Sequence, residues 1–213
     1  MTTDQLIALL VADLKPVDRR RVLHAVITAL AIGLTAAIAV MTLTFTFPPE
    51  FLDERNLEFL SIKLLFASVV VATTAVFLPQ LARPGAPMRG VPAFALIPFV
   101  MIAAAAVVAL ASAHFSAWPG MIVEPDSLTC LPSIPFIAIL PFIALIWSLR
   151  RGAPTDRIRA GAFAGVAAGG LGAFACAFPC AEQSLPSIAL WYGVPIGICA
   201  AIGAKLGPSL LRW

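Results

Sequence analysis

Long apolar runs alternate with short polar segments along the whole chain. Crossing a bilayer as a helix takes about 20 apolar residues. Six runs reach that length: Val22–Phe47, Leu57–Leu78, Val91–Ala113, Leu131–Leu149, Ile158–Pro179 and Ser187–Gly207. The first run is too long, and too far from residue 1, for a cleaved signal peptide. The pattern therefore predicts an all-α, polytopic membrane protein with six transmembrane helices.

The composition supports this fold class and excludes an ordinary soluble domain. Hydrophobic residues make up 61% of the 213-residue chain and charged residues only 12%, and the mean hydropathy is +0.98. Soluble domains have about 25% charged residues. The connections between runs are short, so the predicted organisation is a segment over residues 1–21, a six-helix bundle over 22–207 and a stub over 208–213.

The basic residues orient the predicted bundle. With six spans, twelve of the 14 Lys and Arg residues fall on one face. These are Lys15, Arg19, Arg20, Arg21, Arg83, Arg89, Arg150, Arg151, Arg157, Arg159, Lys205 and Arg212. The positive-inside rule then places both termini in the cytoplasm. The formal charge of +3 comes from this face, so it indicates membrane orientation and not nucleic-acid binding.

Residues 1–21 form the only cytoplasmic segment large enough to hold a partner. Apolar residues recur there at helical spacing, and Lys15-Pro16 ends the pattern because a residue before proline avoids the α region. The apolar face consists of Leu6, Ile7, Leu9, Leu10, Val11 and Leu14. This short amphipathic helix needs a surface to cover it. Two surfaces remain open: its own membrane, or the groove of a soluble partner.

Two further patterns concern packing within the membrane. Small residues recur every four positions in the last two spans, which predicts a tight helical hairpin. The rows are Gly161, Gly165 and Gly169 in span five, and Gly193, Gly197 and Ala201 in span six. Pro141 lies in the middle of span four and predicts a kink there that can serve as a hinge.

Cys130 and Cys180 lie at the ends of spans, on the face opposite the basic residues. The start of a helix lowers a thiol pKa, so Cys130 is the expected first target of an oxidant and Cys180 the expected resolving thiol. A structural disulfide remains an alternative. A third is weak metal capture with His114, Glu124 or Glu182, although the spacing matches no zinc motif. Cys176 and Cys199 lie within spans and are expected to act as small apolar residues.

No catalytic or cofactor-binding pattern accompanies these thiols, so the sequence predicts neither an enzyme nor a bound cofactor. His24 and His114 are the two histidines, and no nucleophile neighbours either of them. Lys63 is the one basic residue inside a span; near the outer edge, it is expected to reach towards water or to pair with Glu58. A transporter or channel, and a structural subunit with a stabilising disulfide, remain as alternative functions.

The order of these segments resembles the NrsF family of integral-membrane anti-sigma factors. The similarity lies in Thr3-Asp4-Gln5-Leu6-Ile7, in Ala12-Asp13-Leu14-Lys15-Pro16-Val17, in six following spans, in the Arg150-Arg151-Gly152-Ala153-Pro154 turn, and in the terminal Leu211-Arg212-Trp213. It covers essentially the whole chain, through order and spacing more than through any single motif.

The resemblance implies a bacterial inner-membrane protein that holds an extracytoplasmic-function sigma factor inactive in the cytoplasm. It implies that Cys130 and Cys180, at the periplasmic face, are needed for a response to oxidants or heavy metals. The expected sigma-binding residues are Leu6, Ile7, Leu9, Leu10, Asp13 and Leu14. The lipid bilayer and the sigma factor are the expected partners, with no direct nucleic acid and no small-molecule substrate.

Overall fold

The computed structural model describes residues 19–45, 54–82, 91–123, 127–152, 154–180 and 184–212, with the backbone alone for 19–21, 54–56, 91–92 and 127–130. The helices are α2 (Arg19–Thr44), α3 (Glu54–Leu81), α4 (Val91–Ser112), η1 (Phe115–Ala117), α5 (Trp118–Ile122), α6 (Ser127–Ile137), α7 (Ile139–Arg150), α8 (Arg157–Cys176) and α9 (Leu185–Leu210). The amphipathic helix predicted near the N-terminus lies outside the described residues.

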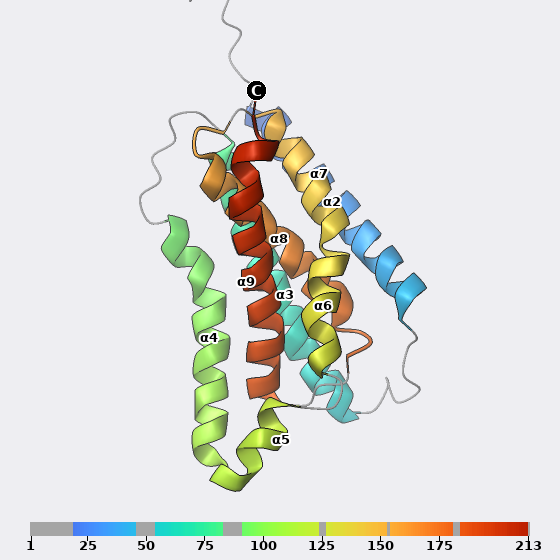
Figure 1. The fold of residues 1–213 in the computed structure, drawn as a ribbon, viewed down its shortest axis with the longest axis vertical. Coiled ribbons are helices and arrows are strands. Elements are labelled where there is room, and N and C mark those ends of the chain that lie inside the picture. Colours follow the sequence, from blue (N-terminus) through green and yellow to red (C-terminus); the bar gives the residue numbers. More distant parts are fainter. Residues whose placement is uncertain are drawn as a thin grey trace, which may run out of the picture.

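The all-α class and the six membrane-length segments are confirmed. The six segments are Val22–Thr44, Leu57–Leu81, Ala93–Ser112, Leu131–Arg150, Arg157–Cys176 and Leu185–Leu210. Each agrees with a predicted span to within a few residues. The fourth segment consists of two helices, α6 and α7, that follow one another across the bundle (Figure 1).

The outer surface of the bundle is apolar, as a lipid-facing surface must be. Leu43 is 88% exposed, Val108 69% and Met101 68%. The membrane-length part of α4, at the edge of the bundle in Figure 1, has only 11% of its residues buried. Soluble proteins rarely expose so extensive an apolar surface to water. The helical fold also satisfies its own backbone hydrogen bonds, which a bilayer requires.

Helix α8 forms the centre of the bundle and contacts α2, α3, α6, α7 and α9. In it, 72% of the residues of the membrane-length window are buried. Twelve of its 20 residues are Gly or Ala, so neighbouring backbones can approach closely. Asp156 caps its first turn by accepting a hydrogen bond from the Arg159 backbone N–H at 3.0 Å.

The predicted hairpin between spans five and six is confirmed, but one of its two small-residue faces was assigned wrongly. Gly161 and Gly165 do face α9. A Cβ at Gly161 would lie 2.8 Å from the Cα of Gly207, and one at Gly203 3.1 Å from the Cα of Gly165. The α9 face therefore includes Gly203 and Gly207. Gly193 and Gly197 have open space where a side chain would stand, because the contact face turns away from them along α9.

The fourth membrane segment breaks at Ala138, three residues before Pro141. Proline lacks the N–H that would bond to the carbonyl one turn earlier, and its ring crowds that carbonyl. Helix α2 passes close to the break, because a Cβ at Gly33 would lie 3.2 Å from the Cα of Pro141 and 3.1 Å from Leu171 Cδ1. The role of Pro141 as a hinge stays a prediction.

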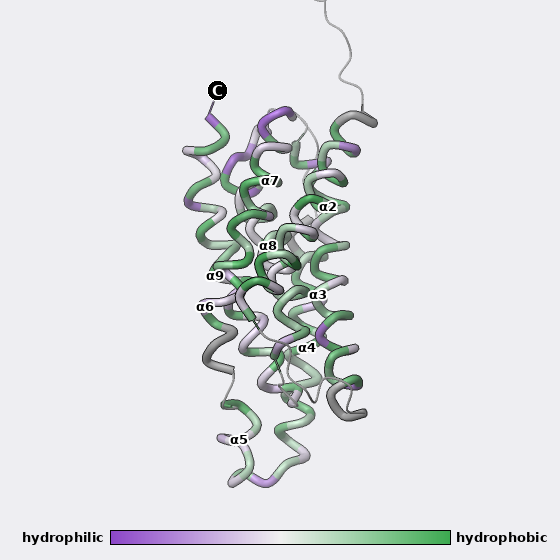
Figure 2. The backbone as a smooth tube through the Cα atoms, turned by 90° about the vertical axis from the view of Figure 1, so that its right-hand side faces the viewer, coloured by the Kyte–Doolittle hydropathy of each residue, from purple (hydrophilic) through white to green (hydrophobic). Residues whose placement is uncertain are grey.

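The two ends of the bundle differ in polarity, and hydrophilic residues gather at the end where the chain finishes (Figure 2). We call this the arginine end, defined by Arg150, Arg151, Arg157, Arg159 and Arg212. The Arg150 Nε donates to the Leu210 carbonyl, and the Arg151 guanidinium lies 3.9 Å from the centre of the Trp147 ring. The hydrogen bond from Arg150 joins α7 to the end of α9.

Candidate functional site

At the opposite end, where α8 finishes, two thiols lie in contact. We call this the thiol end, defined by Lys63, Cys176 and Cys180. Cys176 is the last residue of α8, and its side chain is fully buried, whereas Cys180 follows a short turn and is partly exposed. Their Sγ atoms are 3.3 Å apart. A disulfide needs about 2.05 Å, so a small movement would join them.

Lys63 ties this turn to α3. Its side chain is only 2% exposed, so the expectation that it reaches towards water is wrong. Its Nζ donates to the Cys180 carbonyl at 2.6 Å and lies 5.9 Å from the centre of the Tyr192 ring on α9. Carbonyl groups just beyond a helix C-terminus lack helical donors, and a buried ammonium requires such acceptors. Lys63 therefore connects α3 to the turn that carries Cys180.

The short helices η1 and α5, which follow α4, fold back onto the same end. Ser184 donates to the Met121 carbonyl at 2.6 Å, and Trp191 Nε1 donates to the Ile122 carbonyl at 2.7 Å. Ser184 also caps α9 by accepting from the Ser187 N–H at 3.3 Å. The end of α5 is thus held by hydrogen bonds to the start of α9, and Ser184 is four residues after Cys180 in the sequence.

Cys130 lies in the first turns of α6, and the structure describes its backbone only. Helices α6 and α8 run in opposite directions, and a Cβ at Gly172 would lie 2.7 Å from the Ile134 carbonyl oxygen. One turn farther towards the thiol end, the same register brings the backbone of Cys130 level with Cys176. The direct pairing of Cys130 with Cys180, and the expected order of their oxidation, stay predictions.

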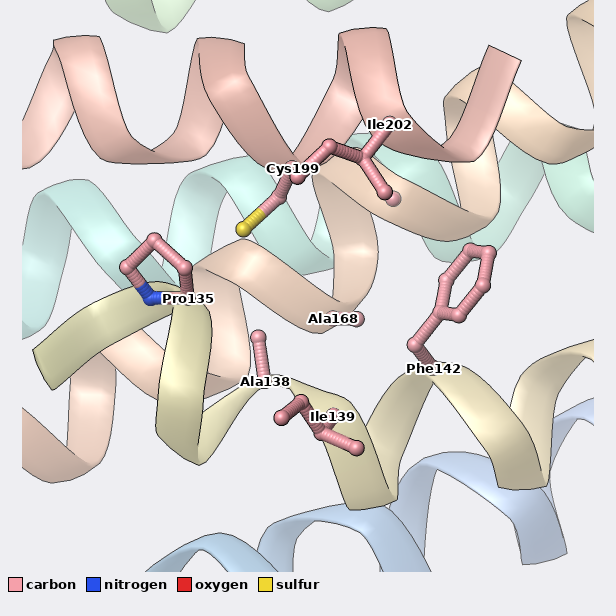
Figure 3. Close-up of a pocket in the computed structure, with 8 residues that line it drawn as sticks. Pro135, Ala138, Ile139, Phe142, Ala168, Cys199 and Ile202 are labelled. Carbon is pink, nitrogen blue, oxygen red and sulfur yellow. The ribbon is translucent and has the colours of Figure 1, made fainter. Parts of the chain in front are cut away.

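Cys199 is separate from the thiol end. It lies on α9 in a shallow apolar pocket over the α6–α7 break, and its sulfur points into that pocket towards Pro135 and Ala138 (Figure 3). The side chain is 8% exposed and packs in an apolar cluster. Cys199 thus has the apolar surroundings that its position in the sequence predicts.

Of the other predicted site residues, the structure describes His114 and leaves most of the rest undescribed. His114 is exposed at the start of η1. Within the described part of the chain, no three His, Cys, Asp or Glu side chains gather as metal ligands. The proposed ligands Glu124 and Glu182 are not described, and neither are the expected sigma-binding residues: Leu6, Ile7, Leu9, Leu10, Asp13 and Leu14.

Sequence reasoning missed the contact of Cys176 with Cys180 by treating Cys176 as a small apolar residue. The signal was present, because residues four apart lie on one side of a helix and its final turn. It also missed the bond between Lys63 and the Cys180 carbonyl. Nothing in the sequence links residues 117 positions apart, so only the fold could reveal it.

The fold and these residues define a six-span helical membrane protein with a buried lysine and a thiol pair at one end. The family model described as "Negative regulator of sigma F" (NrsF) matches residues 10–213. The chain belongs to this family.

Two relatives carry related names. The chain is 28% identical over 213 residues, all of both chains, to "Probable anti-sigma-F factor NrsF" of Azospira oryzae. It is 37% identical over 86 residues, 40% of each chain, to "Anti-sigma-F factor NrsF" of Caulobacter vibrioides. No solved structure matches the chain significantly.

Proposed function

We propose that this protein is a membrane-bound anti-sigma factor that holds an extracytoplasmic-function sigma factor in the cytoplasm. The carrying observation is the family match over residues 10–213, together with a relative named as an anti-sigma-F factor that aligns over the full length of both chains. Residues 1–21 bind the sigma factor, residues 22–207 form the bundle and residues 208–213 form a cytoplasmic stub. The arginine end faces the cytoplasm of the bacterial inner membrane.

The signal enters at the thiol end, which in this proposal faces the periplasm. Cys130 and Cys180 respond to an oxidant or a heavy metal there. A signal alters the bound sigma factor only if it differs in free energy between two states of the bundle. A tenfold loss of affinity requires about 1.4 kcal/mol, and a disulfide supplies a few kcal/mol. The free energy that one disulfide supplies is therefore sufficient to release the bound sigma factor.

The packing of α2 supports a route between the two ends. Helix α6 begins at the thiol end and breaks at Ala138, and Gly33 of α2 approaches Pro141 just beyond that break. Helix α2 then lies along α7, and its first three residues, 19–21, are the last three of the proposed sigma-binding segment. A change in the angle at the break would move α2 against α7. That movement reaches the segment that binds the sigma factor.

The test is a promoter reporter for the cognate sigma factor in cells. Leu10→Asp is expected to raise the unstressed signal at least tenfold, because a charge in the apolar face weakens binding. Gln5→Asp, which places the same charge outside that face, is the matched control and should leave the reporter silent. Cys130→Ser and Cys180→Ser should stay silent under hydroperoxide or cadmium, while Cys199→Ser should respond normally. Unchanged output in Leu10→Asp and both sensor variants would end the proposal.

Pro141→Ala is expected to weaken transmission without abolishing binding. Alanine restores the missing N–H and lets the α6–α7 segment straighten. The unstressed reporter should remain low, and the induction ratio should fall about threefold or more. Pro98→Ala, in the edge helix α4, provides a control that removes a proline away from α2. Equal induction in the two variants would show that the break carries no signal.

A further inference from the structure

We propose that Cys176 is the resolving thiol for Cys180, so that oxidation at the thiol end closes a disulfide at the end of α8. Cys130, which the proposed function also requires for the cellular response, is not a partner in that bond. The role of this disulfide in releasing a sigma factor rests on the proposed function, whereas the formation of the disulfide does not. It assigns Cys176 a part that neither its apolar position nor the family implies. The carrying observation is the 3.3 Å between the two Sγ atoms.

The two thiols are unequal in access, which fixes their order of reaction. Cys180 is partly exposed and lies in the turn beyond α8, whereas Cys176 is buried at the end of the helix. An oxidant from the aqueous side therefore reaches Cys180 first. Among the thiols whose side chains the structure describes, the sulfur within reach of Cys180 is that of Cys176, 3.3 Å away.

The chemistry needs one hydroperoxide for each disulfide. The Cys180 thiolate attacks the peroxide, the O–O bond breaks, and an alcohol or water leaves with a proton while Cys180 becomes a sulfenic acid. The sulfur of Cys176 then attacks that of Cys180. The S–O bond breaks, and hydroxide leaves as water with the proton from Cys176. Two electrons have passed from the dithiol to the peroxide.

Lys63 links the formation of this disulfide to the packing of two helices, α3 and α9. Closing 3.3 Å to a bond length pulls the turn that carries Cys180, and the carbonyl of Cys180 accepts the hydrogen bond from Lys63 Nζ at 2.6 Å. Lys63 lies on α3 and next to Tyr192 of α9. Movement of that carbonyl therefore shifts the contacts of both helices with Lys63. The dithiol and the packing of the bundle are thereby coupled.

The test uses the purified full-length protein in lipid nanodiscs, without a sigma factor. After hydrogen peroxide treatment and blocking of remaining thiols, cleavage after Arg159, Glu182 and Lys205 yields Ala160–Glu182 with Cys176 and Cys180, and Gln183–Lys205 with Cys199. Cys130 falls in a separate peptide. A Cys176–Cys180 disulfide leaves Ala160–Glu182 unlinked and lighter by two hydrogens, whereas a Cys130–Cys180 disulfide joins two peptides.

The expected result is the internal disulfide, in the wild type and in Cys130→Ser alike. In Cys176→Ser and Cys176→Ala, dimedone should trap Cys180 sulfenic acid at least tenfold more than in the wild type, while Cys199→Ser behaves as the wild type. The alanine variant preserves an apolar site if serine disturbs folding. Linkage to the Cys130 peptide alone, with unchanged trapping in both Cys176 variants, overturns the inference. Because no sigma factor is present, that outcome leaves the anti-sigma proposal standing.

Discussion

Replacing Gly203 by leucine is expected to separate α8 from α9 and to lower the free energy of unfolding by about 3 kcal/mol. Overpacking a tight contact usually costs about 1–3 kcal/mol, and this site belongs at the upper end of that range. A Cβ at Gly203 would lie 3.1 Å from both the carbonyl carbon of Gly161 and the Cα of Gly165. These are backbone atoms of the central helix, which cannot turn aside as a side chain can.

Gly197→Leu is the matched control for Gly203→Leu. It makes the same substitution in the same helix, where a Cβ would meet nothing within 4 Å. Its effect should stay within about 0.5 kcal/mol. The measurement is thermal or denaturant unfolding of the protein in detergent micelles, followed by tryptophan fluorescence. Equal stability in the two variants would mean that α9 does not pack on α8 through this face.

The contrast between these glycines shows what sequence patterns can and cannot give. The four-residue spacing predicted close packing of the last two spans correctly. It placed Gly193 and Gly197 on the contact because spacing identifies a row of small residues without fixing how the helix is rotated. The rotation depends on which face α8 presents, and therefore on every helix around α8.

For the candidate site too, the sequence predicted some features and not others. The basic residues and the apolar runs predicted six spans, and the helix ends predicted that Cys180 lies at a bundle end. The four-residue spacing of Cys176 and Cys180 pointed to their contact, but the contact also depends on the three-residue turn after α8, whose shape spacing alone does not give. The burial of Lys63 was unpredictable for a different reason. Its acceptor is a backbone carbonyl, and every residue carries one.

Replacing Lys63 by alanine is expected to lower the free energy of unfolding by about 3 kcal/mol and to loosen the turn that carries Cys180. The buried stem loses about 0.8 kcal/mol for each methylene removed. The Cys180 carbonyl also loses a donor, which costs about 1–3 kcal/mol for a buried group. Relief from burying an ammonium offsets part of this loss. The net effect remains destabilising because alanine leaves both a cavity and an acceptor without its donor.

Lys63→Met separates these contributions, because methionine keeps most of the buried stem and removes only the donor. Its expected cost is about 1 kcal/mol, well below that of alanine. Leu65→Ala on the same helix is the control for a lost side chain at a lipid-facing position, since Leu65 is 66% exposed. Unfolding in detergent gives the stabilities, and the rate of thiol labelling reports the turn. Both Lys63 variants should label Cys180 faster than the wild type, and Leu65→Ala should not. If methionine were as damaging as alanine while labelling stayed slow, Lys63 would support the packing of α3 without holding the turn at Cys180.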